Sequence, residues 1–219
     1  MCFSATASFT AGITLSVLGV ATLRQVPSRR EFLLGTFPLL FAIQQFSEGV
    51  VWLTLGHDSF NSINSLVTYL FLFFATVIWP IFCPLSIYLL EPSVVRRKIS
   101  LGLAIIGIAF GIYLFGFVLR YGVDLAKFSG NLLYDLNFIP FYESNKYLYL
   151  IVTAFPFLLA SEFQLKLFGA FVIFSFGTSE FFYKVTFVSV WCFFAAVLSA
   201  GLYFIVRELK HRSIKVVAD

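Results

Sequence analysis

Seven stretches without an acidic or basic side chain run through this chain, and they limit its fold more than any other feature. They cover residues 1–23, 32–47, 59–90, 99–119, 147–161, 167–179 and 185–206. A helix needs about 20 residues to cross the roughly 30 Å hydrocarbon core of a bilayer, and several of these stretches reach that length. We therefore expect a membrane protein that crosses the bilayer several times.

The composition supports this expectation and excludes other classes of protein. Hydrophobic residues make up 60% of the 219 positions and charged residues 12%, whereas soluble domains have about 45–50% and about 25%. This balance does not fit a disordered chain, a nucleic-acid-binding module or an ordinary cytosolic enzyme. The expected partner is the lipid bilayer rather than nucleic acid, and the sequence leaves the oligomeric state open.

The charge-free stretches are expected to be helices rather than strands. Only helices and closed barrels satisfy every backbone hydrogen bond within lipid, and the stretches lack the two-residue alternation of barrel strands. We predict an all-α polytopic membrane protein, a seven-transmembrane-helix bundle that forms one domain over residues 1–219. Its helices are expected near residues 3–23, 31–56, 63–90, 98–119, 141–161, 164–182 and 184–207. Glu162 and Lys166 interrupt the fifth and sixth helices, so a re-entrant hairpin is an alternative there.

The distribution of basic residues predicts the orientation of the bundle. Eleven of the fifteen Lys and Arg fall in the first, third and fifth connections and in the C-terminal tail, and four fall on the other face. Cationic loops resist translocation, so we expect the N-terminus outside and the C-terminus inside. The opening MCFSATASF has no positive charge, so the first apolar run is expected to be a retained helix rather than a cleavable signal peptide.

The longest connection, residues 120–140, mixes charged and apolar side chains. Leu125, Phe128, Leu132 and Leu136 recur at helical spacing, which predicts an amphipathic helical segment at the membrane interface. This segment is expected to lie across the outer mouth of the bundle. We interpret it either as an anchored connector or as a lid over an opening.

An acidic residue in the second predicted helix is the leading candidate for a functional group. Glu48 lies about eight residues from the outer end of that helix, roughly 12 Å deep at 1.5 Å per residue. Gln44 and Gln45 precede it by four and three residues, so the three polar side chains lie on adjoining faces of the helix. Ionisable groups inside a span are costly and commonly functional. We interpret Glu48 as a buried acid at the floor of an outward-facing pocket, or alternatively as a neutral hydrogen-bond partner between helices.

The third predicted helix contains the segment WPIFCP, in which Pro80 and Pro84 each remove a backbone donor. A kink is expected there, with the carbonyl of Thr76 left free because Pro80 has no N–H group. Such a carbonyl is tolerated at membrane depth where it faces protein or a water-filled cavity, which Trp79 is placed to close. Packing alone is the alternative explanation of the two prolines.

The three cysteines have different expected environments. Cys83 is placed toward the cytoplasmic half and Cys192 in the outer half, so these two are not expected to form a disulfide. Removal of Met1 would leave Cys2 at the N-terminus, where a thiol beside a free amine is a candidate nucleophile or metal ligand. An ordinary cysteine at the start of a helix is the alternative.

Histidine is nearly absent, which limits the metal sites that the chain offers. His57 is expected in an outer connection and His211 in the basic tail, whereas catalytic zinc commonly has three protein ligands and an open fourth position. No metal site is therefore predicted, and the three-histidine pattern of seven-helix ceramidases is not expected. The seventh predicted helix has no internal Lys to hold retinal, and no cofactor is assigned.

Four segments of the chain have distinctive sequences, namely MCFSATASF, QQFSEGVVWLTL, WPIFCP and SVWCFFAAVLS. Together they resemble a family of uncharacterised bacterial integral membrane proteins, and the opening MCFSA is the most specific part. The resemblance covers most of the chain and implies a multi-pass protein of the bacterial inner membrane, without an assigned activity. It adds weight to Cys2, Glu48, Trp79 and Cys192 as positions to investigate, without giving them roles.

These observations lead to three functional hypotheses. The first is a protein that binds or transports a small or lipidic ligand through an outward-facing polar cleft. Its ligand-binding residues are expected to be Gln44, Gln45, Glu48, Trp52, Trp79, Trp191 and Cys192. The second is an intramembrane enzyme, with Cys2 as nucleophile or metal ligand and Glu48 as acid or base. The third is a structural or assembly partner whose interior is dry and fully packed.

Overall fold

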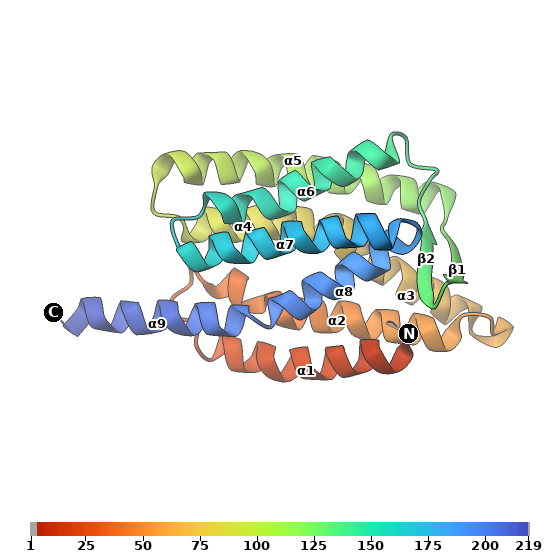
Figure 1. Ribbon diagram of the computed structural model, residues 1–219, viewed down its shortest axis with the longest axis horizontal. Helices are drawn as coiled ribbons and strands as arrows, with labels where there is room; N and C mark the ends of the chain where they lie inside the picture. Colours follow the sequence, from red (N-terminus) through yellow and green to blue (C-terminus); the bar gives the residue numbers. More distant parts are fainter. Residues whose placement is uncertain (1–3, 219) are drawn as a thin grey trace.

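The protein is a helical bundle with a small β-hairpin across one end (Figure 1). The computed structural model describes residues 4–218, and the side chains of residues 4–212. The helices are α1 (Ala5–Leu23), α2 (Phe32–Thr54), α3 (Asn61–Phe73), α4 (Trp79–Leu90), α5 (Val94–Tyr121), α6 (Tyr142–Leu159), α7 (Phe163–Phe182), α8 (Phe187–Ser199) and α9 (Leu202–Ala218). The shorter elements are η1 (Asp58–Phe60), η2 (Phe74–Ile78), η3 (Lys184–Thr186), β1 (Asp124–Phe128) and β2 (Asn131–Asp135).

Within the described residues, the nine helices form seven rods. The π-helix η2 joins α3 and α4 into one rod, and α9 continues from α8 after a bend at residues 200–201 (Figure 1). Six of the rods agree with predicted helices to within a few residues, and the seventh runs on to Ala218, beyond the predicted end at residue 207. Both α6 and α7 run along the bundle, with 18 and 20 residues, so they are full helices rather than a re-entrant pair.

By length and composition, five of the rods in the described part of the chain can cross a membrane. They lie at Ala5–Leu23, Asp58–Leu90, Val94–Tyr121, Phe163–Phe182 and Lys184–Arg212. The other two, α2 and α6, carry more polar side chains: α2 contains two glutamines and a glutamate, and α6 begins with the segment YESNK. The helices α2 and α6 are therefore less apolar than the other five rods.

The third rod changes its hydrogen-bond register at η2. The Trp79 N–H donates to the carbonyl of Phe74, five residues earlier, as in a π-helix. In that register the carbonyl of Ala75 faces Pro80, which has no N–H to donate. The Tyr149 hydroxyl of α6 donates to this carbonyl instead. The irregularity expected at the proline is therefore present, and a side chain from another rod compensates for it.

The carbonyl that the Tyr149 hydroxyl satisfies belongs to Ala75, one residue before the Thr76 carbonyl that the sequence predicted to be free. Two glycines of α5 let that helix pack closely against the irregular segment. A methyl group on Gly107 would lie 2.0 Å from the Pro80 carbonyl oxygen, and one on Gly111 would lie 3.0 Å from the Thr76 carbonyl oxygen. Backbone carbonyls of this segment thus face protein rather than lipid, as the bilayer requires.

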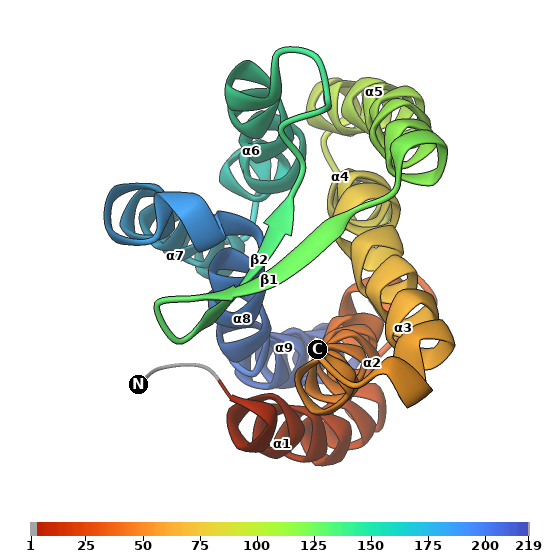
Figure 2. The same ribbon diagram turned by 90° about the vertical axis from the view of Figure 1, so that its right-hand side faces the viewer.

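Residues 124–135 form a hairpin rather than the predicted amphipathic helical segment. The strands are antiparallel, and Phe128 pairs with Asn131 next to the turn. Ser129 and Gly130 form the turn with φ of 50° and 80°, the geometry of a two-residue turn in a twisted hairpin. Figure 2 looks along the bundle from this end and shows the hairpin lying across it.

The burial of β2 explains why helical spacing misled the prediction. Leu132, Tyr134 and Leu136 alternate with more exposed positions, are each at most 4% exposed and face the bundle. Leu125 and Phe128 were assigned to the same helical face, but they lie on β1, where Leu125 is only partly buried and Phe128 is exposed. The buried residues Leu132, Tyr134 and Leu136 are two apart, as on one face of a strand. Leu132 and Leu136 are also four apart, which fits one face of a helix, so spacing alone did not distinguish the two structures.

The end of the bundle opposite the hairpin holds most of the basic residues (Figure 1). We call it the basic end, and it comprises residues 24–31, 91–98 and 160–166 together with α9. There the Arg212 guanidinium pairs with the Glu162 carboxylate at 2.8 Å, and Lys210 donates to the Arg24 carbonyl at 3.4 Å. The two faces distinguished by charge in the sequence are therefore the two ends of one bundle.

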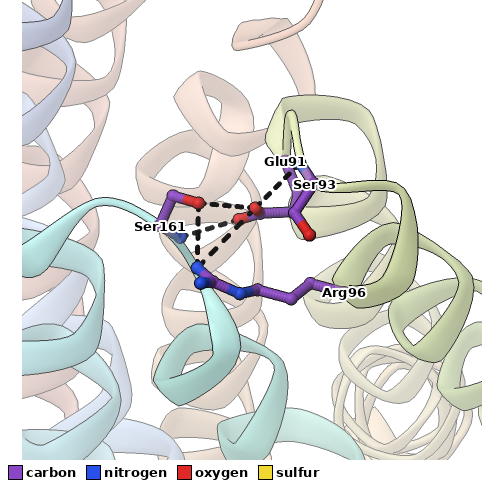
Figure 3. A network of polar contacts seen from close by, with 4 residues as sticks. All are labelled: Glu91, Ser93, Arg96 and Ser161. Carbon is purple, nitrogen blue, oxygen red and sulfur yellow. Dashed lines mark hydrogen bonds and ion pairs between the residues drawn. The ribbon is translucent and has the colours of Figure 1, made fainter.

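A buried carboxylate joins two turns at the basic end. Glu91 follows α4, is 3% exposed, and accepts hydrogen bonds from the hydroxyl and backbone N–H of Ser161 at 2.6 and 2.7 Å. The Ser93 N–H donates at 3.1 Å, and the Arg96 guanidinium lies 3.9 Å from the carboxylate (Figure 3). Both carboxylate oxygens have partners, so this network anchors the α4–α5 turn to the α6–α7 turn.

Candidate functional site

Two cavities lie between the helices along the bundle axis. The hairpin-side cavity has a volume of about 60 Å³ and is lined by η2, α5, α6, α8 and the segment that follows β2. The mid-bundle cavity has a volume of about 50 Å³ and is lined by α2, α4, α6, α7 and α8. Each is large enough to hold a few water molecules.

Three side chains line both cavities and form the wall between them. These are Tyr149 of α6 with Trp191 and Cys192 of α8. The rings of Tyr149 and Trp191 meet edge to face, with centroids 5.2 Å apart and an interplanar angle of 71°. The indole N–H of Trp191 has no hydrogen-bond partner among the described residues. Movement of these two rings would join the cavities into one.

The wall of the mid-bundle cavity includes Trp79, which is held in place from two sides. Its ring stacks on Phe41 with a centroid distance of 3.8 Å, and its indole N–H donates to the Gln44 side-chain oxygen at 2.8 Å. The Gln44 amide nitrogen lies 3.4 Å from the Phe71 carbonyl of α3. Gln44 therefore positions Trp79 and does not itself line the cavity.

At the hairpin side, the lining includes a buried ammonium group. Lys146 of α6 is 5% exposed, and its nitrogen lies 2.7 Å from the Glu180 carboxylate of α7 and 2.8 Å from that of Glu143. The same nitrogen lies 5.1 Å from the centre of the Phe187 ring, a cation–π contact. Its charge is therefore balanced within the protein and does not by itself call for an anionic ligand.

Beside the cavities lies a second polar group, which we call the Glu48 cluster: Ser8, Gln45, Glu48 and Ser189. Glu48 is 1% exposed, and the Ser189 hydroxyl of α8 donates to its carboxyl at 2.6 Å. Ser8 of α1 and Gln45 also lie next to the carboxyl. Neither the oxygen nor the nitrogen of the Gln45 amide has a hydrogen-bond partner among the described residues. The cluster thus brings together oxygen atoms from three helices.

The structure separates the predicted ligand-binding residues into two groups. Trp79, Trp191 and Cys192 line one or both cavities. The remainder, namely Gln44, Gln45, Glu48 and Trp52, are not among the residues that line them. The indole N–H of Trp52 has no partner in the described part of the chain, and the Lys127 ammonium lies 5.6 Å from its ring centre.

The predicted outward-facing polar cleft at Glu48 differs from what the structure contains. The two cavities have mainly apolar and aromatic walls, and Glu48 is enclosed beside them. The physical reason is the hairpin: its buried side chains, including Tyr134, cover the end of the bundle toward which Glu48 was expected to open.

The cysteines are only partly described. Cys2 lies outside the described residues, so its role as a nucleophile or metal ligand, and the enzyme hypothesis that depends on it, stay predictions. Cys83 and Cys192 are both buried and unpaired, and both line the mid-bundle cavity. In the described part of the chain, no three His, Cys, Asp or Glu side chains gather in a way that could hold a metal ion.

Sequence reasoning missed the ion pairs at the hairpin side of the cavities. Lys146 lies near the start of the predicted helix 141–161 and directly precedes the charge-free stretch 147–161, and Glu180 directly follows the stretch 167–179. Consecutive helices run in opposite directions, so these two positions come to the same end of the bundle. That placement is the signal that could have paired them. Nothing in the sequence identified Tyr149 as the donor to a backbone carbonyl.

The chain belongs to a family of unknown function, DUF6629, whose family model matches residues 1–216. The expected membership of an uncharacterised family is thereby confirmed. Comparisons with curated proteins and with solved structures gave no match.

Proposed function

We propose that the protein crosses the membrane seven times and binds a small ligand in its two cavities, with the hairpin end outside the cell. The observation that carries this proposal is the pair of cavities that meet at Tyr149, Trp191 and Cys192. Ligand sites are commonly concave, mainly apolar and lined by a few polar groups, and sites between the helices of bundles are frequent. Here the polar groups are the Lys146 ammonium and the unpartnered Trp191 N–H.

Burial of their polar residues supports α2 and α6 as the sixth and seventh spans. Gln44, Gln45 and Glu48 of α2 are each at most 1% exposed, so the outer face of this helix presents apolar side chains. Lys146 of α6 is likewise turned inward and neutralised by carboxylates. Polar side chains are tolerated in spans when they face the interior of a bundle. The excess of basic residues at the opposite end supports an outward-facing hairpin.

The size of the cavities favours a small ligand over a lipid. An engineered cavity of about 150 Å³ binds benzene in another protein, and the cavities here are smaller, at about 60 and 50 Å³. A ligand of a few non-hydrogen atoms fits without rearrangement, and a larger one requires the Tyr149–Trp191 wall to move. Leu136 and Ile139, which follow β2, also line the hairpin-side cavity. The hairpin is therefore the segment whose displacement would open the site.

Labelling of the native thiol at the cavity wall tests this proposal. A variant with Cys2→Ser and Cys83→Ser keeps only Cys192. We expect a small, charged methanethiosulfonate to modify Cys192 in folded protein when it is added from the hairpin side of oriented membrane vesicles. Intact-mass measurement gives the rate of modification. Access from this side is expected because Cys192 lines the cavity nearest the hairpin.

The matched control keeps Cys83 and replaces Cys192 with serine. Cys83 lines only the mid-bundle cavity, so its modification from the hairpin side is expected to be slower. Reaction of both thiols only after denaturation would contradict a ligand-accessible interior. Faster reaction from the basic side would contradict the proposed path of entry.

A further inference from the structure

The Glu48 carboxyl is enclosed in protein and has no basic partner among the described residues. It is 1% exposed and lies on α2 between α1 and α8. The ion pairs among the described residues involve other carboxylates, at Glu91, Glu143, Glu162, Glu180 and Glu208. A buried carboxylate is stable only when a cation balances its charge or a proton neutralises it.

A second observation at the same place indicates a missing partner. Gln45 is 0% exposed and lies beside the Glu48 carboxyl, and neither of its amide atoms makes a hydrogen bond of normal geometry with another described residue. The Tyr134 hydroxyl of β2 is also buried, has no hydrogen-bond partner in the described part of the chain, and is within electrostatic reach of Glu48. Buried polar groups in native proteins are nearly always satisfied, and those that are not commonly mark a bound ion or water.

The chemistry of the cluster selects the kind of ion. Its donors are oxygens: the Glu48 carboxylate, the Gln45 amide oxygen and the hydroxyls of Ser8 and Ser189. Hard oxygen donors suit alkali and alkaline-earth cations rather than transition metals. The set contains one carboxylate, which balances a single positive charge. Because Glu48 lies outside the residues that line the two cavities, the ion has to fit between closely packed side chains.

We propose that Ser8, Gln45, Glu48 and Ser189 form a binding site for a sodium ion. The ion would supply the partner that the Gln45 oxygen lacks and would balance the charge of Glu48. Ser189 precedes Cys192 by three residues on α8, so the ion would lie one helical turn from the wall shared by the two cavities. The inference goes beyond the proposed ligand site, because it concerns other residues and holds whether or not the cavities bind a ligand.

Melting of the full-length protein in detergent tests the site, with sodium chloride replacing choline chloride at constant ionic strength. We expect the melting temperature to rise with sodium concentration and to saturate, because a ligand that binds only the folded state stabilises it. Potassium chloride in the same series is expected to produce a smaller rise at each concentration. Binding of radioactive sodium to the purified protein, measured in parallel, gives the dissociation constant directly.

Three variants make the test specific. Glu48→Gln is expected to abolish both the sodium-dependent rise and sodium binding, while Glu208→Gln on the exposed surface of α9 leaves both unchanged. Ser189→Ala removes one neutral donor and is expected to weaken sodium binding about tenfold, equivalent to about 1.4 kcal/mol. It provides the test if Glu48→Gln does not fold.

Two results would contradict the proposed sodium site. Equal effects of sodium and choline on the normal protein would overturn the site and indicate a carboxyl neutralised by a proton. A sodium effect that persists in Glu48→Gln or is unchanged in Ser189→Ala would place the ion elsewhere. Neither outcome bears on the modification of Cys192, so failure of this inference and failure of the proposed ligand site are distinguishable.

Discussion

Two carboxylates buried in this bundle, Glu91 at the basic end and Glu48 nearer the hairpin, have opposite surroundings. Glu91 is 3% exposed and is surrounded by donors: two from Ser161, one from Ser93, and the Arg96 guanidinium 3.9 Å away. Glu48 is 1% exposed and accepts a hydrogen bond of 2.6 Å from the Ser189 hydroxyl, with the neutral side chains of Ser8 and Gln45 beside its carboxyl. Both oxygens of the Glu91 carboxylate therefore have partners, and this group links two turns. The Glu48 carboxylate can still accept another partner.

The contrast extends to the neighbouring residues. Near the hairpin, the side chains of Gln45, Trp52, Tyr134 and Trp191 have buried polar atoms without a hydrogen-bond partner in the described part of the chain. The turns at the basic end are joined by the Glu91 network (Figure 3) and by the Arg212–Glu162 ion pair. Unsatisfied polar groups cost stability, so their concentration near the hairpin supports the proposals that place a ligand and an ion in this region.

The largest expected effect is at the anchor. Glu91→Gln removes the negative charge with which Ser161 forms hydrogen bonds and Arg96 an ion pair. We expect this change to lower the free energy of unfolding by about 3 kcal/mol. The same change at the other site, Glu48→Gln, is expected to cost less than about 1 kcal/mol in sodium-free buffer, because no basic partner is lost. Unfolding in mixed micelles, followed by circular dichroism, measures both. Equal losses would remove the distinction between the two carboxylates.

The next effect concerns the charged cluster beside the hairpin-side cavity. Lys146→Met leaves the Glu180 carboxylate without its partner at 2.7 Å, and we expect a loss of about 2 kcal/mol in the free energy of unfolding. Lys146→Arg keeps the charge and serves as the matched control, with a smaller loss. An unchanged free energy of unfolding in Lys146→Met would contradict a role of the ammonium in holding α6 to α7.

A change of the opposite sign is expected at Gln45. Gln45→Leu replaces an unpartnered amide by an apolar group of similar size, so we expect a gain of about 1 kcal/mol in sodium-free buffer. Ser161→Ala at the basic end is the counterpart and is expected to destabilise the protein, because it removes a hydrogen bond of 2.6 Å to Glu91. Melting temperatures of both variants check the prediction. Destabilisation by Gln45→Leu would mean that the amide already has its partners.

The smallest effect is expected in the turn of the hairpin. Gly130 has a φ of 80°, which side-chain-bearing residues adopt at a cost, so Gly130→Ala is expected to weaken the hairpin by about 0.5 kcal/mol. That value corresponds to roughly a twofold faster modification of Cys192 if the hairpin covers the cavity. Gly130→Asn, which tolerates positive φ better, is the control. An unchanged rate of modification would separate the hairpin from access to the cavity.

The sequence was sufficient to predict the helices, because lipid imposes a simple rule on them. Charge-free stretches of adequate length have to be helical, and the rods follow those stretches closely. The hairpin escaped prediction because it lies outside the stretches, where residues such as Leu132 and Leu136 fit both a strand and a helix. Its turn at Ser129 and Gly130 contained the deciding signal, a residue pair suited to positive φ.

The site was predictable only in part, for a different reason. A glutamate among apolar residues had to be buried, and Glu48 is buried. Which groups meet it depends on contacts between distant segments: Ser189 is 141 residues away along the chain. The same holds for Tyr149 and the Ala75 carbonyl, which are 74 residues apart. Such pairs follow from the packing of rods, which charge patterns and spacing do not specify.

The most direct test of the account is an experimental density map of the hairpin end, obtained from protein in sodium chloride and again in choline chloride. We predict density between the Glu48 carboxyl and the Gln45 amide oxygen in sodium chloride, at ion-coordination distance from both, and its loss in choline chloride. A Gln45 amide bonded directly to Glu48 in both maps, with no density between them, would contradict the claim that this end is built to bind.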